Sequence, residues 1–357
     1  DIINLLKIFN CCFILTGNGS VRLIKRTWML KSYVWRFALT FIFLINVYNG
    51  TKWALNNVLD ILEPVSIVLI ASVQLKLLGP LFSIFWRFYF DNELSNVLKK
   101  CMDMLDVLKK FKSGVVLKTK IFWIFIVFTL IHVMVHVTIQ LGFSYQVLDY
   151  SVFNNVLWLC VFTYNRFMFY EYMLLITFFQ IIVYKLNDEI SKGKIPIRQL
   201  EMMYTSTMEN LDLINRFIVG APVLINIIMG SMCNMVYILY HYVLFKGLFI
   251  KFDVHIFFPI LHVTMKLFDI SILYYLCQTT EKEISRTTLI LNKKSITENL
   301  TGRRKIAFFS LRRLHANFHF ELCGFHKINL RQLLSLLFKT AIFLVIQIQL
   351  NIKTLSQ

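Results

Sequence analysis

The sequence predicts an all-α membrane protein with seven membrane-spanning helices, and composition and hydropathy pattern both support that fold class. Of its 357 residues 57% are hydrophobic and only 16% are charged, with a mean hydropathy of +0.63. A soluble domain of this length carries more charge. Seven apolar stretches each reach the roughly 20 residues that a helix needs to cross a ~30 Å hydrocarbon core. They cover residues 32–51, 64–86, 121–142, 151–184, 217–245, 254–279 and 325–350.

The distribution of Lys and Arg predicts the orientation of these spans. The segments that connect the spans alternate in their content of Lys and Arg. Four of them hold 27 of these residues together, and the other four hold only 4. The basic set consists of the N-terminal segment and residues 87–120, 185–216 and 280–324. Lys and Arg are retained on the cytoplasmic side during insertion. We therefore expect a cytoplasmic N-terminus, an extracellular C-terminus and an odd number of spans.

The net charge of +18 would indicate nucleic-acid binding in a soluble protein. Here the excess lies in the segments predicted to be cytoplasmic, so it favours attraction to anionic lipids of the inner leaflet. We expect no nucleic-acid partner. The seven cysteines form no Cys-X-X-Cys pair, and no two of them lie in two extracellular loops. We therefore expect no structural disulfide.

The cytoplasmic connections are predicted to be helical rather than unstructured. In residues 89–112 apolar side chains recur every three to four positions with charges between them, the pattern of an amphipathic helix. Segments 198–216 and 280–316 behave similarly, and the fourth span has no polar break until Lys185. This pattern predicts helices that project into the cytoplasm as an anchor region. The alternative is that they lie on the inner membrane surface.

Polar residues inside the spans predict a ligand pocket that opens outward among spans 2 to 6. A charge near the bilayer centre is costly and should face a partner or an aqueous cavity. Arg166, Glu171, Lys266 and Asp269 are such charges, and the last two lie one turn apart and are able to pair. The predicted lining comprises Gln74, His132, His136, Gln140, Asn155, Trp158, Tyr237, His241 and His262. The alternative is interhelical hydrogen bonding without a ligand.

Metal-binding and catalytic signatures are weak or absent in the sequence. His132 and His136 have a metal-compatible i, i+4 spacing, but no nearby carboxylate or Cys completes a site, so we expect no metal and no cofactor. The sequence has no GxSxG, HExxH, Walker A or GxGxxG motif. We therefore expect that the protein is not an enzyme.

Residues 320–350 read FELCGFHKINLRQLLSLLFKTAIFLVIQIQL and resemble the C-terminal signature of the insect gustatory receptors, of the same superfamily as insect odorant receptors. The signature starts with a small residue, Gly and an aromatic, which residues 323–325 match. It ends with Thr-Tyr, five hydrophobic residues and Gln-Phe. The family's spacing places residues 342–343 at Thr-Tyr and 349–350 at Gln-Phe, where only Gln349 is identical. A second register, through Thr340 and Gln347, fits the distance from Gly324 less well.

The resemblance implies a ligand-gated, non-selective cation channel of four subunits in the plasma membrane of a sensory neuron. In that family the seventh helix of each subunit lines the pore, and cytoplasmic helices form the anchor where subunits meet. Carried over by position, Ile346 and Leu350 would face the pore, Gln349 would lie beside the constriction, and Phe343 would couple the helix to its neighbours. The alternative is that this stripe faces lipid or simply packs against other helices. The whole chain, 1–357, would be one domain, with residues 280–350 forming an anchor helix and the pore helix.

The resemblance also implies partners, namely a small-molecule tastant, other receptor subunits in a homo- or heterotetramer, membrane lipids and cations. The departure from the signature at Ile342 favours a divergent, bitter-type receptor over a sugar receptor. An odorant-receptor-like subunit is the main alternative. The inverted charge bias argues against a G-protein-coupled receptor, and the lack of an inverted repeat argues against a transporter.

Overall fold

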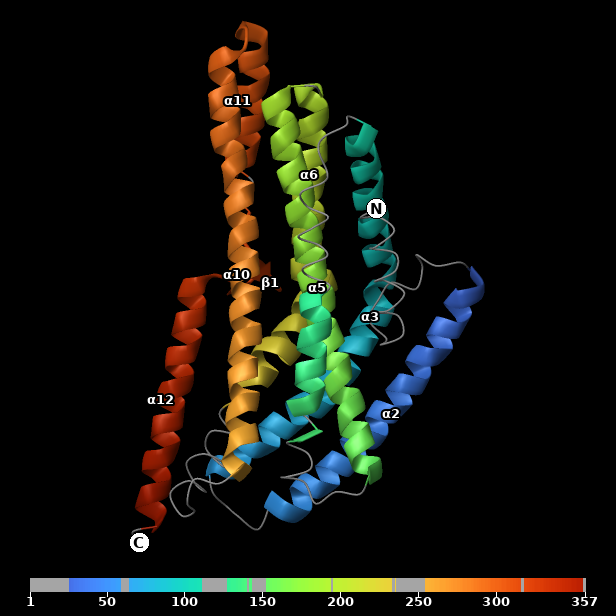
Figure 1. Cartoon of the computed structure of the whole chain (residues 1–357), viewed down its shortest axis with the longest axis vertical. Coiled ribbons are helices and arrows are strands. Elements are labelled where there is room, and N and C mark those ends of the chain that lie inside the picture. Colours follow the sequence, from blue (N-terminus) through green and yellow to red (C-terminus); the bar gives the residue numbers. More distant parts are fainter. Residues whose placement is uncertain are drawn as a thin grey trace.

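The computed structural model consists almost wholly of helices in the part of the chain that it describes. That part comprises residues 26–58, 64–110, 127–139, 141–142, 152–193, 195–232, 235, 254–315 and 318–355. α5 (Val152–Lys192) and α10 (Val254–Thr297) run side by side along the molecule, and the C-terminal helix stands at one edge of the bundle (Figure 1). α2 (Arg26–Val58) packs against α3 (Pro64–Lys110).

Helices α2 (Arg26–Val58) and α3 (Pro64–Lys110) contain the first two predicted spans. α3 begins at Pro64, where the missing backbone N–H costs nothing because the first turn of a helix leaves its N–H groups without intrahelical partners. The helix then continues without interruption through the amphipathic segment, and Leu94, Leu98 and Leu105 on one face enter the core. The predicted helix after the second span is therefore confirmed as an extension of that span.

Helix α5 (Val152–Lys192) confirms the prediction that the fourth span continues beyond Lys185 as one helix. It lies in the centre of the bundle, and most of its side chains between Tyr164 and Ile190 are buried. The helix ends at Gly193, which has a φ of 70° and donates its N–H to the carbonyl of Glu189 at 3.0 Å. A left-handed residue at this position is a common way to end a helix.

The predicted fifth span is not one regular helix. α6 (Ile197–Leu213) leads into a π-helical segment, η2 (Ile214–Ile218), and the chain then bends by 53°. Beyond the bend lie α7 (Gly220–Pro222) and a second π-helical segment, η3 (Val223–Met229). The predicted span from residue 217 therefore begins at the end of η2, and its described part after the bend is helical from residue 220 to residue 232. The bend needs Gly220, because a Cβ there would lie 1.8 Å from the carbonyl oxygen of Asn215.

Helix α10 (Val254–Thr297) contains the sixth predicted span and continues far beyond it, as the periodicity of 280–316 predicts. The chain then reverses, and α11 (Leu300–His315) returns beside the end of α10 (Figure 1). The side chain of Asn299 accepts the backbone N–H of Gly302 at 2.8 Å and so satisfies a donor that a helix start leaves without a partner.

A short β-hairpin joins α11 to the last helix and includes the predicted start of the seventh span at residue 325. Its strands are β1 (Glu321–Leu322) and β2 (His326–Lys327), and both Cys323 and Gly324 in the turn have positive φ. α12 (Leu330–Leu355) begins five residues later than predicted. The side chain of Asn329 accepts the backbone N–H of Gln332 at 2.8 Å and caps the start of the helix.

Two helical segments in the described ranges are long and apolar enough to cross a membrane, Tyr164–Lys192 and Ile260–Thr297. The bent pair Ile197–Ile218 and Gly220–Met232 also qualifies if it counts as one broken span. A shorter apolar helix covers Val127–Ile139 within the third predicted span. The count of seven spans and the orientation of the termini remain predictions.

Candidate functional site

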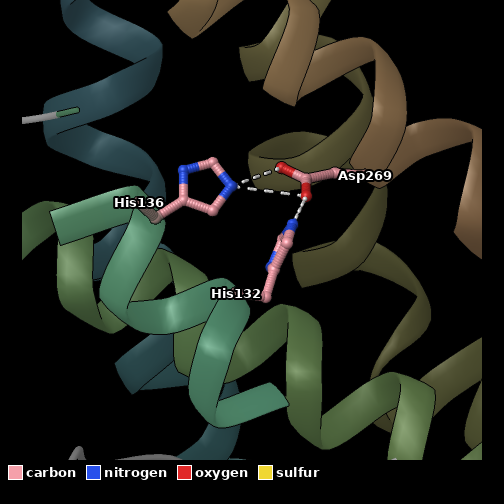
Figure 2. Close-up of side chains that lie close together, drawn as sticks. All are labelled: His132, His136 and Asp269. Atoms are coloured by element: carbon pink, nitrogen blue, oxygen red, sulfur yellow. Dashed lines mark hydrogen bonds and ion pairs between the residues drawn. The ribbon is translucent and has the colours of Figure 1, made fainter. Parts of the chain in front are cut away.

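A buried polar cluster lies where the helix Val127–Ile139, α5 and α10 meet. His132 and His136 come from the first helix, Arg166 and Tyr170 from α5, and Asp269 from α10. The two imidazole rings point toward the Asp269 carboxylate from successive turns of their helix (Figure 2). The i, i+4 spacing places both rings on one face, so the local sequence determines this convergence.

The distances in the cluster are those of direct contact. Nε2 of His132 lies 3.0 Å from Oδ1 of Asp269, and Nε2 of His136 lies 3.4 Å from both carboxylate oxygens. Arg166 donates to Oδ2 of the same carboxylate through Nη1. Nδ1 of His132 contacts the hydroxyl group of Tyr170. One carboxylate therefore joins three helices.

The electrostatic balance of this cluster explains how it tolerates burial. The exposed fractions of the Arg166 and Asp269 side chains are 7% and 2%. A buried charge is costly unless it is paired and hydrogen-bonded. The guanidinium of Arg166 pairs with the carboxylate, and the two imidazoles add polar contacts to it.

A second set of buried ion pairs joins α2, α3 and α5. Arg87 of α3 donates to the carboxylate of Glu171 on α5, and Arg36 of α2 donates to Asp91 of α3 at 3.3 Å. Glu171 lies five residues after Arg166 on the same helix. α5 therefore uses one charge to bind α10 and another to bind α3.

The hairpin before α12 is fixed to the bend between α6 and α7. The backbone N–H of Cys323 donates to the carbonyl of Asn215 at 3.3 Å, and the side chain of Asn215 accepts the hydroxyl of Tyr172 at 2.7 Å. On the other side of the hairpin, Nε2 of His326 lies 2.9 Å from the hydroxyl of Tyr274 on α10. The start of the last helix is therefore tied to α5, to the bend and to α10.

Helix α12 presents a largely apolar surface to its surroundings. Its exposed hydrophobic side chains are Leu330, Leu334, Phe338, Ile342, Phe343, Val345 and Ile346. Of the four predicted pore residues, Phe343 is 40% exposed, Ile346 is 46% exposed and Gln349 is exposed. Leu350 lies in α12, but its side chain is outside the described residues. Within the single chain this helix face lacks a partner among the residues that the structure describes.

The structure brings together only part of the predicted ligand pocket. His132 and His136 share the cluster, and His262 is buried on α10 seven residues before Asp269. Gln74 on α3 instead donates to Thr51 of α2 at 3.2 Å. The remaining predictions lie outside the described residues or have side chains that do, namely Gln140, Asn155, Trp158, Tyr237 and His241.

The prediction that no carboxylate lies near the histidine pair is wrong. A carboxylate does stand beside the histidine pair, since one donor atom each from His132, His136 and Asp269 lie within 4.8 Å of one another. The sequence argument failed because 133 residues separate His136 from Asp269. The pairing of Lys266 with Asp269 stays a prediction, while Arg166 and the two histidines contact this carboxylate directly.

Sequence reasoning left Arg166, Tyr170 and Asp269 out of the site. The charge of Arg166 and Asp269 within apolar spans was the signal that could have included them. Tyr170 carries no such signal, because tyrosine is common in helices of this kind. Asn215 and Cys323 were missed because their contact depends on a bend that the sequence did not predict.

The overall fold is similar to that of a solved insect olfactory receptor. One is the insect olfactory receptor OR5 from Machilis hrabei, with a TM-score of 0.68 and 11% identity over 97% of this chain and 98% of that chain. Another is the same receptor in complex with eugenol, with a TM-score of 0.65, 13% identity and the same coverage.

The chain has the fold of an insect olfactory receptor. No family model matches the sequence, and no curated protein matches it either. At 11–13% identity the likeness shows the fold along nearly the whole length of the chain and does not by itself show the ligand or the activity.

Proposed function

We propose that this chain is a subunit of a ligand-gated, non-selective cation channel of the insect chemoreceptor superfamily, in the plasma membrane of a sensory neuron. The observation that carries the proposal is the match of 97% of the chain to an insect olfactory receptor. The resemblance of residues 320–350 to the gustatory signature supports it independently, because it rests on sequence motifs rather than on the fold. Both solved neighbours are receptors rather than enzymes.

Four subunits would place their α12 helices around a central pore. The support is the exposed apolar face of α12, which would need lipid or a neighbouring subunit to cover it. Ile346 and Leu350 would form an apolar constriction beside Gln349, and such a ring can gate by dewetting. Phe343 would couple the pore helix to its neighbour, and the helical part within residues 280–350 would supply the anchor between subunits.

Ligand binding among the outer halves of the helices would favour the open arrangement only if the open state binds the ligand more tightly. The contacts of the hairpin offer a route from pocket to pore, because they join the start of α12 to α5, α10 and the bend. A change in the angle of the bend would move the base of the pore helix.

The ligand class has two candidates, each favoured by one observation. The gustatory signature at residues 323–325 and at Gln349 favours a tastant, and the departure at Ile342 favours a bitter compound. The solved neighbours favour an odorant, and one of them is in complex with eugenol. We propose a taste receptor first and an odorant-receptor-like subunit second.

Whole-cell current from cells that express the full chain tests the proposal. The probes are a panel of bitter tastants and sugars beside a panel of volatile odorants that includes eugenol. Leu350→Ala and Gln349→Ala should change leak or ion selectivity of the evoked current. The matched control is Leu337→Ala, because Leu337 packs against the core of its own subunit.

Each result has a distinct meaning. Evoked cation current that only the Leu350 and Gln349 variants alter supports both the channel and the pore residues. If Leu337→Ala alters the current as much as the other two variants do, the assignment of the pore residues is contradicted. Absence of current at verified surface expression, with the chain alone and with other receptor subunits, contradicts the channel. A response restricted to odorants would replace taste with smell.

A further inference from the structure

We propose that His132, His136 and Asp269 form a binding site for a transition-metal ion, with Zn²⁺ as the fitting ion. The inference goes beyond the channel function and does not depend on it. It rests on three donor atoms that come from two helices and converge in the protein interior (Figure 2). All three side chains are buried, with exposed fractions of 4%, 1% and 2%.

The separations between the donor atoms fit a tetrahedral site. Zn²⁺ lies about 2.0–2.1 Å from imidazole nitrogen and about 2.0–2.2 Å from carboxylate oxygen, so two ligand atoms of a tetrahedron lie about 3.3 Å apart. The two nitrogen-to-oxygen separations here are 3.0 and 3.4 Å. The third pair of donor atoms, the two imidazole nitrogens, lies within 4.8 Å, and a water molecule would supply the fourth ligand.

The contact between His132 and Asp269 is also compatible with two ligands of one metal ion. Its Nε2 lies 3.0 Å from Oδ1 of Asp269 but does not form an aligned hydrogen bond with it. Neighbouring ligands of one ion have this relation, because each nitrogen lone pair points at the metal and not at the adjacent oxygen.

A second contact orients the proposed ligand. Histidines that bind metals generally use their other ring nitrogen to hold a polar group, which sets the tautomer and the ring orientation. Nδ1 of His132 contacts the hydroxyl of Tyr170. With the proton on Nδ1, the lone pair of Nε2 is directed toward the position between the three donors.

The charges around the cluster decide which ions fit. Arg166 occupies Oδ2 of Asp269 and already neutralises it, and Lys266 lies one turn away on α10. Ca²⁺ and Mg²⁺ require several oxygen ligands, whereas two imidazoles and one carboxylate suit Zn²⁺ or Cu²⁺. Affinity would therefore come from the two imidazoles. The positive charges would make it weaker than that of a zinc site built of thiolates.

The test measures metal bound to the purified full chain in detergent. The chain is equilibrated with ZnCl₂, separated by gel filtration and analysed for zinc, and Co²⁺ is then used as a spectroscopic probe of coordination number. His132→Gln and His136→Gln remove a metal ligand but leave an amide N–H for Asp269. The control, His262→Gln, removes a buried histidine of α10 about two turns from Asp269.

We expect one zinc ion per wild-type chain and per His262→Gln chain, and strongly reduced binding in the two ligand variants. Tyr170→Phe should weaken zinc binding by about 10–100-fold, the usual cost of losing an outer hydrogen bond to a metal ligand. Co²⁺ should show the intense visible absorption of four-coordinate geometry.

Three outcomes would overturn the proposal. They are wild-type protein without bound zinc, equal zinc in wild type and in the two ligand variants, and an equal loss in His262→Gln. If a ligand variant does not fold, the Co²⁺ spectrum of the wild type decides alone, because a six-coordinate spectrum would contradict the four-coordinate geometry inferred from these donors.

Discussion

Helices α5 and α12 are both long and apolar, yet they stand in opposite environments. In α5, 83% of an apolar stretch of 18 residues within Tyr164–Lys192 is buried inside the chain. In α12 most of the large apolar side chains up to residue 346 are exposed. Hydropathy cannot distinguish these two cases. The difference indicates that α5 is covered by other helices of the chain, whereas the described residues leave one face of α12 uncovered.

The polar residues of the two helices differ in the same sense. α5 carries Arg166 and Glu171, each bound to a charge on another helix. These two ion pairs fix the rotation of α5 about its axis and its position along that axis. α12 is fixed at its start, where the hairpin contacts Asn215 and Tyr274. Further along α12 the hydroxyl of Thr340 donates to the sulfur of Met232 at 3.6 Å. Neither the contacts of the hairpin nor that of Thr340 is a buried ion pair of the kind that holds α5.

The largest effect expected follows from breaking the ion pair that fixes α5. Asp269→Leu removes the carboxylate that neutralises Arg166 and should cost about 3–5 kcal/mol of stability, since an uncompensated buried charge remains. The double variant Arg166→Leu/Asp269→Leu should recover most of the loss. The measurement is the fraction of protein that stays monodisperse in gel filtration after heating. A double variant as unstable as Asp269→Leu would show that shape, not charge, fixes α5.

A matched pair of leucines tests the contrast directly. Leu186 on α5 is fully buried, and Leu334 on α12 is 61% exposed. Leu186→Ala should cost about 2–5 kcal/mol, whereas Leu334→Ala should stay within about 0.5 kcal/mol in the isolated subunit. Thermal unfolding of dissociated subunits measures both. Comparable losses in the two variants would mean that α12 packs within its own subunit after all.

The positions of the helices were largely predictable from the sequence, because span length and amphipathic periodicity are local properties. The extension of α5 past Lys185 and the helix after the second span are examples. The bend at Val219 was not, since it results from a close approach between Gly220 and Asn215. No local sequence pattern predicts such an approach. The hairpin at residues 321–327 was not predicted either, because its strands of two residues each are too short to show an alternating pattern.

The candidate site shows the same division. The i, i+4 spacing predicted that His132 and His136 share a face. Their carboxylate partner could not be predicted, because Asp269 lies on a helix far away in sequence and Lys266 offered a nearer partner. The face of α10 that turns toward α5 determines which partners Asp269 meets, and a single sequence does not reveal that face.

A smaller effect is expected at the junction that joins the two helices. Gly220→Ala places a Cβ 1.8 Å from the carbonyl oxygen of Asn215 and 3.1 Å from the backbone nitrogen of Cys323. The chain must shift, at a cost of about 1–3 kcal/mol. Because the hairpin rests on this point, evoked current should change more than thermal stability does. The control is Gly230→Ala, whose Cβ would meet only the carbonyl of Ile225 at 3.3 Å. An equal change in current for both variants would argue against a role of the junction.

The smallest effect is expected in the reactivity of two free thiols. Cys101 on α3 lies in the core around α5, and Cys323 lies at the base of α12. Burial raises the pKa of Cys101 to about 12, so at pH 8 its thiolate fraction should be on the order of 1,000-fold below that of an ordinary thiol with pKa near 8.5. Alkylation of the folded protein should therefore modify the partly exposed Cys323 first.

The raised pKa of Cys101 also predicts how the stability of the protein depends on pH. The unfolded thiol of Cys101 ionises near pH 8.5, whereas the folded thiol stays protonated until about pH 12. The unfolded state therefore loses a proton first, and stability should fall as pH rises between these values. Cys101→Ala should lose this component of the pH dependence. If wild type and Cys101→Ala lose stability in parallel over this range, and Cys101 is alkylated as fast as Cys323, then α3 does not hold Cys101 in a dry core. The contrast between an inward-held α5 and an outward-facing α12 would then be weaker than the burial of their side chains indicates.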